Sequence, residues 1–495
     1  MQRRQGATRQ AGHGMKRAAA LFGAIILAFA GAAFAHPGHS PAVPPWQGAS
    51  PWPDRVVATL ETDPATSFAV SWRTDASVTE TIAQIAPASG DARFDLAAET
   101  LSARTEPVDL ERLRREGADL AIPWNSGLPP VHYHSVNFTG LKPDTLYAYR
   151  VRGAAGAWSE WFHLRTGPAS GPVTFLYLGD AQNGILSHWS RTVRAAFQKA
   201  PDARFIIHAG DLVNRGSRDL EWAEWFKAVG FIHGMIPAIP VTGNHEYDTL
   251  VGAPITIRRT LSILWRPQFR LPEHAELDPV LRETVFAVRY TPDLHVFALD
   301  TDNAGTLAAQ AAWLDAQLAA STARWRVVTM HHPIFSSGQG RDNRERRETL
   351  LPVFRKHKVD LILQGHDHTY ARGSIAPQTP QRVAAGAGEA VDMMFVNSVS
   401  GPKQYRFKES RWNEYRPDGV RLDRMAENTQ FFQAITVDGD TVTYRAYTAT
   451  GELYDSVSMR KGPDGAKRVI EGERSTMAER TRANTGAFVD TDDLK

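Results

Sequence analysis

The chain has 495 residues, of which 42% are hydrophobic and 22% are charged, and its formal net charge is +2. This is the composition of a globular protein long enough for two or three domains, without the blocks of like charge that bind nucleic acid. The sequence contains no cysteine. Disulfides, thiolate nucleophiles and cysteine-based metal sites are therefore excluded, and a metal ion would need ligands from His, Asp, Glu, Asn, Gln, Tyr or backbone oxygen.

Residues 1–35 have the pattern of an export signal. Basic residues precede the apolar stretch AAALFGAIILAFAGAAFA, which ends in Ala33-Phe34-Ala35, a small-residue pattern typical of signal cleavage. An uncleaved membrane anchor is the alternative, but the apolar stretch is short for a membrane span. We therefore predict cleavage after Ala35, no membrane association afterwards, and a periplasmic or secreted location. The proline-rich residues 36–53 are expected to form a linker.

Residues 54–168 have an all-β pattern. The segment RVVATLETDPATSFAVSWRT predicts two strands around an Asp-Pro turn, and HSVNFTGLKPDTLYAYRVRG predicts two more. Short strands with regular turns are typical of a β-sandwich. The charged residues 105–120 are expected to interrupt it as a partly helical insertion.

From residue 172 onward, strand-like and helical segments alternate. This alternation predicts a layered α/β domain over 172–460 with its strands in the middle. Residues 430–458 are expected to form hairpins, with a turn at Asp438-Gly439. The polar residues 461–495 lack periodicity and are expected to be a mobile tail. The expected helices lie within 187–202, 218–229, 307–321 and 344–358.

Five predicted strands end in residues that can bind a metal ion. In an open α/β sheet the carboxyl ends of the strands line a common crevice, so these residues can meet although they are far apart in sequence. A glycine precedes the polar residue in most of these motifs, and it lets the backbone turn sharply beside a ligand. The motifs are Gly179-Asp180, Gly210-Asp211, Gly243-Asn244-His245-Glu246, Met330-His331-His332 and Gly365-His366-Asp367-His368.

The residue types in these motifs indicate a transition-metal centre. They supply two carboxylates, one amide and at least three imidazoles, and mixed nitrogen and oxygen donors suit Zn, Mn or Fe. One metal ion needs three or four such groups, whereas six suffice for two ions if one carboxylate bridges them. Two ions about 3.5–4 Å apart are a standard arrangement for displacement at phosphorus, so the pattern favours phosphate ester hydrolysis.

The same series of motifs resembles the calcineurin-like metallophosphoesterases. The preceding β domain resembles a fibronectin type III domain in Trp72 and in the segment GLKPDTLYAYRV, and this combination points to the purple acid phosphatase-like branch. The resemblance implies an N-terminal all-β sandwich followed by an α/β/β/α metallophosphoesterase domain. It also implies dinuclear-metal-dependent hydrolysis of small phosphate esters, with phosphomonoesters as the expected substrates and a metal-bridging hydroxide as the nucleophile.

The resemblance further implies roles for single residues. Asp211 matches the carboxylate that bridges both metal ions. His245 matches the histidine that hydrogen-bonds the phosphate and protonates the leaving oxygen, and Glu246 is expected to orient it. The ligands implied for two transition-metal ions (Fe, Zn or Mn) are Asp180, Asp211 and His368 for the first, and Asp211, Asn244, His331 and His366 for the second.

The sequence departs from the family pattern at two positions. Asn214 stands where the purple branch has a tyrosine, and Gln182 stands where many relatives have a histidine. Either side chain could supply a carbonyl oxygen to the first metal, and without the tyrosine the protein is not expected to be purple. His332 is a further candidate, either to contact substrate or only to pack.

Two other functions stay open at this stage. One is a phosphodiesterase or phosphotriesterase that uses the same centre. The other is a metal-poor binding or adhesion protein, which only the substitutions at Gln182 and Asn214 support. No nucleic-acid partner is expected, and the oligomeric state is not determined by the sequence.

Overall fold

The expected β-sandwich folds as two sheets that enclose their own apolar core. The structure, a computed structural model, describes residues 46–117, 125, 127–252, 259–377, 388–472 and 477–485. One sheet of the sandwich has the strand order β1-β2-β6-β5 and the other β4-β3-β7-β8. Trp72, which is fully buried between them, donates its indole N–H to the carbonyl oxygen of Arg152. The strands are β1 (Asp54–Leu60), β2 (Phe68–Asp75), β3 (Ile82–Pro87), β4 (Glu99–Ser102), β5 (Arg104–Pro107), β6 (Val131–Phe138), β7 (Leu146–Val151) and β8 (Phe162–Arg165).

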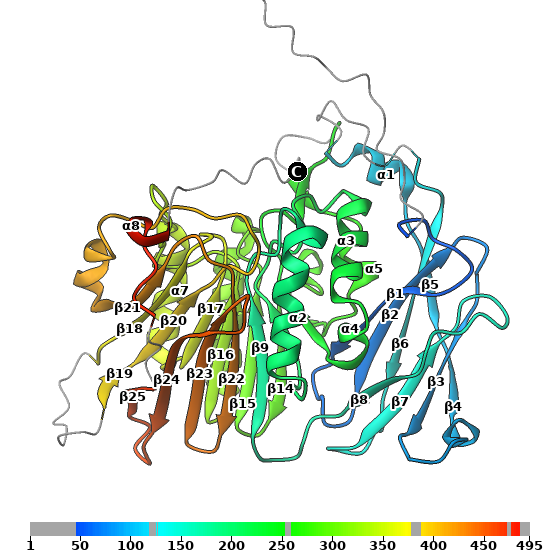
Figure 1. The fold of residues 1–495 in the computed structure, drawn as a ribbon, viewed down its shortest axis with the longest axis horizontal. Helices are drawn as coiled ribbons and strands as arrows, with labels where there is room; N and C mark the ends of the chain where they lie inside the picture. Colours follow the sequence, from blue (N-terminus) through cyan, green and yellow to red (C-terminus); the bar gives the residue numbers. More distant parts are fainter. Residues whose placement is uncertain are drawn as a thin grey trace, which may run out of the picture. The chain divides into compact units, whose positions relative to one another are not determined.

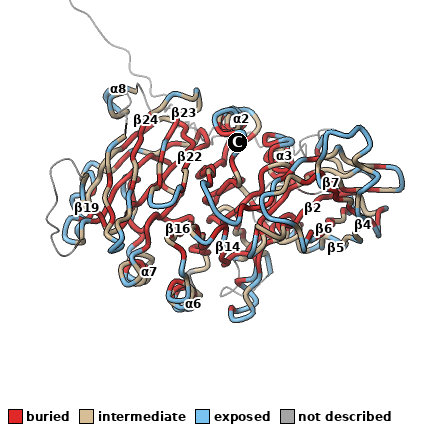
Figure 2. Tube along the Cα trace, turned by 90° about the horizontal axis from the view of Figure 1, so that it is seen from below, coloured by how far each residue is buried: buried red, intermediate tan, exposed pale blue. Residues whose placement is uncertain are grey.

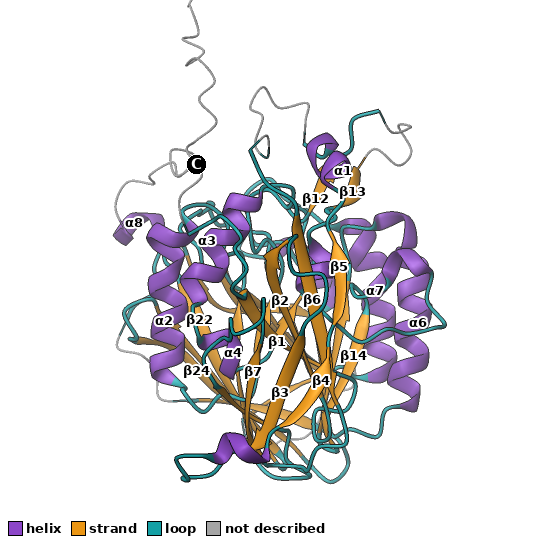
Figure 3. Ribbon diagram, turned by 90° about the vertical axis from the view of Figure 1, so that its right-hand side faces the viewer, coloured by secondary structure: helices purple, strands orange, loops and turns teal. Residues whose placement is uncertain are grey.

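The charged insertion is partly helical, as predicted. It contains β5 and then the helix α1 (Leu110–Arg115). The side chain of Asp109 accepts a hydrogen bond from the backbone N–H of Arg112, which caps the first turn of the helix. In Figures 1 and 3 α1 lies at the top of the molecule, and in Figure 3 it lies near the strands β12 (Tyr247–Thr249) and β13 (Arg259–Leu261).

The second part of the chain contains mixed sheets of parallel and antiparallel strands. The order of the 7-stranded sheet is β14-β15-β16-β17-β20-β18-β21, and β22-β9-β10-β11 lie next to one another in the other large sheet. A separate hairpin pairs β12 with β13. The strands are β9 (Val173–Leu178), β10 (Ile206–His208), β11 (Ala238–Pro240), β12 (Tyr247–Thr249), β13 (Arg259–Leu261), β14 (Phe286–Thr291), β15 (Leu294–Leu299), β16 (Trp325–Met330), β17 (Leu361–Gln364), β18 (Tyr370–Ile375), β19 (Glu389–Val391), β20 (Met393–Asn397), β21 (Val420–Ala426), β22 (Phe431–Asp438), β23 (Thr441–Thr448), β24 (Leu453–Lys461) and β25 (Lys467–Glu471).

Helices cover the outer faces of the two large sheets, which gives the expected layered arrangement (Figures 1 and 3). Apolar residues of α2 and α3 belong to the core that also contains β9, β10, β16 and β17, whereas α6 and α7 pack on the other face of the 7-stranded sheet. Figure 2 shows the strands mostly buried and the exposed residues mainly on loops and outer helix faces. The helices after α1 are α2 (Ser190–Lys199), α3 (Asp219–Val229), α4 (Ile232–Met235), α5 (Trp265–Gln268), α6 (Leu307–Ala320), α7 (Arg344–His357) and α8 (Arg482–Thr485), with a π turn η2 (Ile185–Trp189) before α2 and 3₁₀ turns η1 (Phe94–Ala97), η4 (Pro279–Leu281), η5 (Ala304–Thr306) and η6 (Asn413–Asp418).

One sheet of the N-terminal sandwich continues directly into the large sheet that contains β9, β10 and β11. Strand β1 pairs in parallel with β11 at Thr59 and Ala238, so that both belong to one 12-stranded sheet. Arg55 of β1 also forms a bidentate ion pair with Asp219, the first residue of α3, at 2.8 and 2.9 Å. The described residues from 46 onward accordingly belong to one compact unit. The boundaries predicted at 168 and 172 stay predictions, and the linkage across them is stronger than a flexible connection.

The chain after residue 461 is not simply a mobile tail, and that prediction is wrong for its first part. Residues Lys467–Glu471 form β25, which pairs antiparallel with β24. Val469 is buried, and the ammonium of Lys467 lies 2.8 Å from the buried carboxylate of Asp360, so the strand has both an apolar and a charged anchor. The expected export signal and most of the linker lie outside the described residues. Within the described part, no helix is long and apolar enough to cross a membrane.

Candidate metal centre

The predicted metal-binding motifs meet at one edge of the two large sheets. β9, β10 and β11 run parallel in one sheet, and β16 and β17 run parallel in the other. Each strand is short and apolar, and each of the expected polar residues follows at its carboxyl end. The side chains that come together there are Asp180, Asp211, Asn244, His331, His366 and His368.

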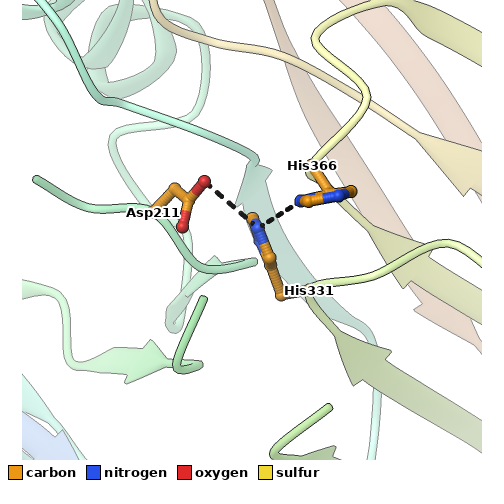
Figure 4. A group of neighbouring side chains, drawn as sticks. All are labelled: Asp211, His331 and His366. Carbon is orange, nitrogen blue, oxygen red and sulfur yellow. Dashed lines mark hydrogen bonds and ion pairs between the residues drawn. The ribbon is translucent and has the colours of Figure 1, made fainter. Parts of the chain in front are cut away.

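One group of potential ligands surrounds His331 (Figure 4). Its Nε2 atom lies 3.1 Å from Asp211 Oδ2 and 3.1 Å from His366 Nδ1. The side-chain oxygen of Asn244 is 2.8 Å from His366 Nδ1 and 3.1 Å from His331 Nε2. The ligand atoms of Asp211, His331 and His366 all lie within 4.8 Å of one another, which is close enough for one ion to contact all three.

A second group of potential ligands also includes Asp211. Asp180, Asp211 and His368 also present ligand atoms within 4.8 Å of one another, and His368 Nε2 is 3.5 Å from Asp180 Oδ1. The amide nitrogen of Gln182 lies 2.8 Å from Asp211 Oδ2 and 3.0 Å from His368 Nε2. Asp211 therefore belongs to both groups, which is the position expected of a bridging carboxylate.

Backbone carbonyl groups orient two of the imidazoles. Nδ1 of His331 lies 2.9 Å from the oxygen of Ala209, and Nδ1 of His368 lies 2.9 Å from the oxygen of Lys403. Because a carbonyl oxygen only accepts hydrogen bonds, each Nδ1 carries the proton. The Nε2 atom of each ring then faces the centre, as in metal-binding histidines.

The loops that carry the ligands have unusual backbone conformations. Asp180, Asp211, His366 and His368 all have positive φ angles, of 37°, 51°, 74° and 47°, which cost energy for residues other than glycine. Gly243 allows a further close approach, since a Cβ atom there would lie 2.3 Å from Asp211 Oδ1. Strain of this kind concentrates at functional sites, where the surrounding structure maintains it.

The centre is buried and its charges are poorly balanced by the protein itself. Burial, reinforced by the nearby Asp211, raises the pKa of Asp180 well above its usual value, although His331 opposes this. Burial lowers the pKa of His331, but Asp211 and Asp180 outweigh it and raise the pKa to about 10. In the protein alone, protons therefore take the positions that cations would occupy.

Comparisons with known proteins agree with this geometry. Residues 53–166 match the family model described as "Purple acid Phosphatase, N-terminal domain", and residues 173–370 match "Calcineurin-like phosphoesterase". Purple acid phosphatase 3 of Arabidopsis thaliana is 30% identical over 263 residues, which cover 49% of this chain and 70% of the relative. The chain belongs to the purple acid phosphatase family. It is therefore a metal-dependent phosphatase, and its family implies a dinuclear metal centre.

Two further matches describe the extent of the relationship. Purple acid phosphatase 17 of Arabidopsis thaliana is 24% identical over 269 residues, which cover 48% of this chain and 75% of the relative. The solved purple acid phosphatase PPD1 from yellow lupin (Lupinus luteus) seeds superposes with a TM-score of 0.63 at 18% identity, covering 84% of this chain and 75% of that chain. This last likeness shows that the N-terminal all-β domain and the α/β domain together have a purple acid phosphatase fold.

The donor set fits the pair of transition-metal ions that a purple acid phosphatase implies. Carboxylate, amide and imidazole donors are crowded together, with Asp211 shared by both groups. Asn244 Oδ1 lies 3.1 Å from the Nε2 atom of His331, which carries a proton in the protein alone because the pKa of His331 is raised. A metal ion would take the place of this proton between the two donor atoms.

His245 lies at the rim of the centre, and Glu246 acts differently from the prediction. The Nδ1–H of His245 donates to the backbone oxygen of Asn214 at 2.6 Å, and its Nε2 is 3.9 Å from Asp211 Oδ2. The carboxylate of Glu246 does not orient this ring. It accepts backbone N–H groups of Asp211, Leu212 and Gly243, so it fixes the two ligand loops against each other. Burial, together with Asp211, raises the pKa of Glu246 to about 8.

The remaining candidates have distinct positions. Gln182 is fully buried beside Asp211 and His368, where rotation of its amide would present the oxygen to an ion. Asn214 contributes its backbone oxygen to His245. His332 is buried, contacts Thr301 Oγ1 at 3.0 Å and packs against the ring of His366 at 4.2 Å, which supports a packing role.

Sequence reasoning missed several residues around the centre. Lys403 supplies the carbonyl oxygen that holds His368, and its ammonium lies 3.4 Å from Gln182 Oε1. Arg341 donates to the backbone oxygen of His366 and lies over the ring of Tyr405, 4.5 Å from its centroid. Lys403 and Tyr405 come from an irregular segment after β20, where no periodic pattern marks them. Arg341 is one of several arginines within residues 341–347, and nothing in the sequence distinguishes it from the others.

Proposed function

We propose that the chain hydrolyses phosphomonoesters with two transition-metal ions held at this centre. Asp180, Asp211 and His368 would hold the first ion, with Gln182 beside it. Asp211, Asn244, His331 and His366 would hold the second ion. The main support for two ions is that both ligand groups include Asp211, because a shared carboxylate distinguishes a dinuclear centre from two separate sites. When bound, two such ions neutralise charge on a phosphoryl group and lower the pKa of bound water.

The protein itself contributes proton transfer through His245. The carbonyl of Asn214 fixes its ring, so that Nε2 points toward the centre. Burial lowers the pKa of His245, and the nearby charge of Asp211 opposes this by raising it. The positive charge of Lys403 lowers the pKa further. A proton carried at Nε2 is therefore transferred readily, and the imidazolium can donate it to the leaving oxygen of the ester.

The alternatives differ in what the site would accept. A diester or triester has fewer ionisable oxygens than a monoester, so the cationic side chains Lys403 and Arg341 near the centre favour the monoester dianion. A metal-poor binding protein would require that the departures at Gln182 and Asn214 abolish metal binding. The second ligand group contains neither residue, and on this proposal it retains its ion.

Metal analysis and a substrate panel test this function together. We expect about two equivalents of Fe, Zn or Mn, and turnover of p-nitrophenyl phosphate well above that of bis(p-nitrophenyl) phosphate or a phosphotriester. Preference for the diester or triester would contradict the monoester assignment. Two bound metals without any turnover would contradict the proposed function.

A variant of His245 tests the proton-transfer role separately. His245→Ala is expected to lower kcat by about 10²–10⁴, which is the usual contribution of a general acid, while metal content stays unchanged. His163→Ala is a suitable control, because His163 is exposed on β8 of the sandwich. Loss of metal from His245→Ala would instead make His245 a ligand.

A further inference from the structure

A cavity of about 230 Å³ opens directly beside the metal centre. Asn244 and His245 line it, and they also border the proposed phosphoryl position. A phosphate ester bound at the centre would therefore place its leaving group in this cavity. The other side chains that line the cavity decide which leaving groups fit.

Two arginines line this cavity and remain partly exposed. Arg259 stands on β13 opposite Thr249 of β12, and its guanidinium donates to the backbone oxygen of Asn244. Arg215 follows the loop of the bridging Asp211. Their side chains are 55% and 39% exposed, so both guanidinium groups can reach a ligand in the cavity.

The protein neutralises these two charges only weakly. The closest carboxylate to Arg215 is Asp248 Oδ1 at 3.8 Å, and Arg259 has Asp302 Oδ2 at 3.5 Å. The carboxylate of Asp248 already accepts a hydrogen bond from Ser217 Oγ at 2.6 Å. Among the described residues, the Arg215 guanidinium donates no hydrogen bond. Loose, partly solvated ion pairs of this kind contribute little, so an anionic ligand can compete for both groups.

The β12–β13 hairpin that carries Arg259 is held in place by the N-terminal part of the chain. The backbone N–H of Gly117, just after α1, donates to the oxygen of Thr249 at 2.7 Å. The buried carboxylate of Glu116 accepts a hydrogen bond from Ser262 Oγ at 3.0 Å, next to the end of β13. The insertion therefore fixes the wall of the cavity, and a pre-organised wall binds with a smaller entropy cost.

We propose that Arg215 and Arg259 recognise a second anionic group on the leaving group of the substrate. Guanidinium groups bind carboxylates and phosphates in a bidentate manner, so the preferred substrates are phosphomonoesters that also carry a carboxylate or a second phosphate. This inference rests on the proposed function and extends it from a reaction type to a substrate class.

Matched substrate pairs test the inference, because the members of each pair differ only in the second anion. O-phosphoserine is compared with O-phosphoethanolamine for a carboxylate, and propane-1,3-diol bisphosphate with propyl phosphate for a second phosphate. In one or both pairs, we expect kcat/KM to be at least about tenfold higher for the ester with the second anion, as is typical of charge-assisted hydrogen bonds. The pair with the larger ratio identifies the group recognised.

Arginine variants then locate the effect. Arg215→Gln and Arg259→Gln should each lower, by about tenfold, the ratio of kcat/KM between the ester with the second anion and the ester without it, mainly through the KM of the former. Arg344→Gln is the control, since Arg344 is exposed on α7 and pairs with Glu348. Metal content is measured in parallel, because Arg259 touches the backbone of Asn244.

The outcomes separate this inference from the proposed function. Turnover of all four esters without preference, or equal losses on both members of a pair, would overturn the role of Arg215 and Arg259 while leaving the phosphatase function standing. Absence of turnover on every ester by the metal-loaded protein would overturn both.

Discussion

Asp180 in the metal centre and Asp219 at the junction with the sandwich are equally buried, with 1% exposure each, but their pKa values move in opposite directions. Burial raises both. At Asp219 the guanidinium groups of Arg55 and Arg73 outweigh it and lower the pKa. At Asp180 the second carboxylate of Asp211 adds to it. A buried acid with its own cations is ionised in the fold, whereas Asp180, which faces a second carboxylate, holds a proton unless a cation from outside replaces it.

The largest expected effect concerns the carboxylate shared by both ligand groups. Asp211→Ala should lower turnover by more than about 100-fold and release both ions, because loss of residues that only support metal ligands already costs about 10–100-fold. Metal analysis after dialysis and a phosphomonoester assay measure the two effects. Retained turnover with two equivalents of metal would refute the bridging position.

A substitution at the junction with the sandwich should lower the stability of the fold and leave the metal content unchanged. Asp219→Asn leaves Arg55 buried without its ion-pair partner, whereas Arg73 keeps its ion pair with Asp54. We expect the free energy of unfolding to fall by about 3–5 kcal/mol at pH 7. Because the folded pKa of Asp219 is lowered, its contribution is complete above the pKa of the unfolded carboxyl, about 3.9, and is lost as the pH falls through the folded value.

Urea unfolding of both proteins at pH 7 and at successively lower pH measures this dependence. The difference between them should shrink below about pH 4, where the unfolded carboxyl begins to take up a proton. A difference that is independent of pH, or loss of metal from Asp219→Asn, would contradict the contrast between the two sites.

The smallest stability effect is expected at Asp180. Its raised pKa means that the ionised form is disfavoured in the metal-free fold, so that its contribution is lost as the pH rises from about 4 through the folded pKa. Asp180→Asn should therefore unfold at the same or a slightly higher urea concentration than the unmodified chain, in chelator at pH 7. Its affinity for the first ion should nevertheless fall by at least about 10–100-fold. If Asp180→Asn destabilised the fold as much as Asp219→Asn, the contrast between the two buried carboxylates would be wrong.

The residues of the metal centre could be predicted from the sequence because each ligand motif is recognisable from the strand directly before it. Asp180, Asp211, Asn244 and His331 each follow an apolar strand, and parallel strands end at one edge whatever their order in the sheet. The four longer helices α2, α3, α6 and α7 lie within the predicted ranges, whereas the short helices α4, α5 and α8 were not predicted. Convergence of the six proposed ligands thus required no knowledge of strand pairing.

Features that depend on pairing between distant segments could not be predicted. The parallel pairing of β1 with β11 cannot be inferred from the sequence of either strand alone. Glu246 carries no signal that its carboxylate binds backbone N–H groups of two loops rather than the ring of His245. Lys403 and Arg259 reach the centre from segments whose position only the tertiary fold determines. The strand β25 is short and charged, and its pairing with β24 became apparent only in the folded chain.

Anomalous diffraction from crystals of the metal-loaded protein can locate both ions and the position of Asp211 between them. We expect two peaks about 3.5–4 Å apart, one bounded by Asp180, Asp211 and His368 and the other by Asp211, Asn244, His331 and His366, with Asp211 oxygens contacting both. A single peak at full metal loading, or two peaks of which only one contacts Asp211, would refute the shared dinuclear centre.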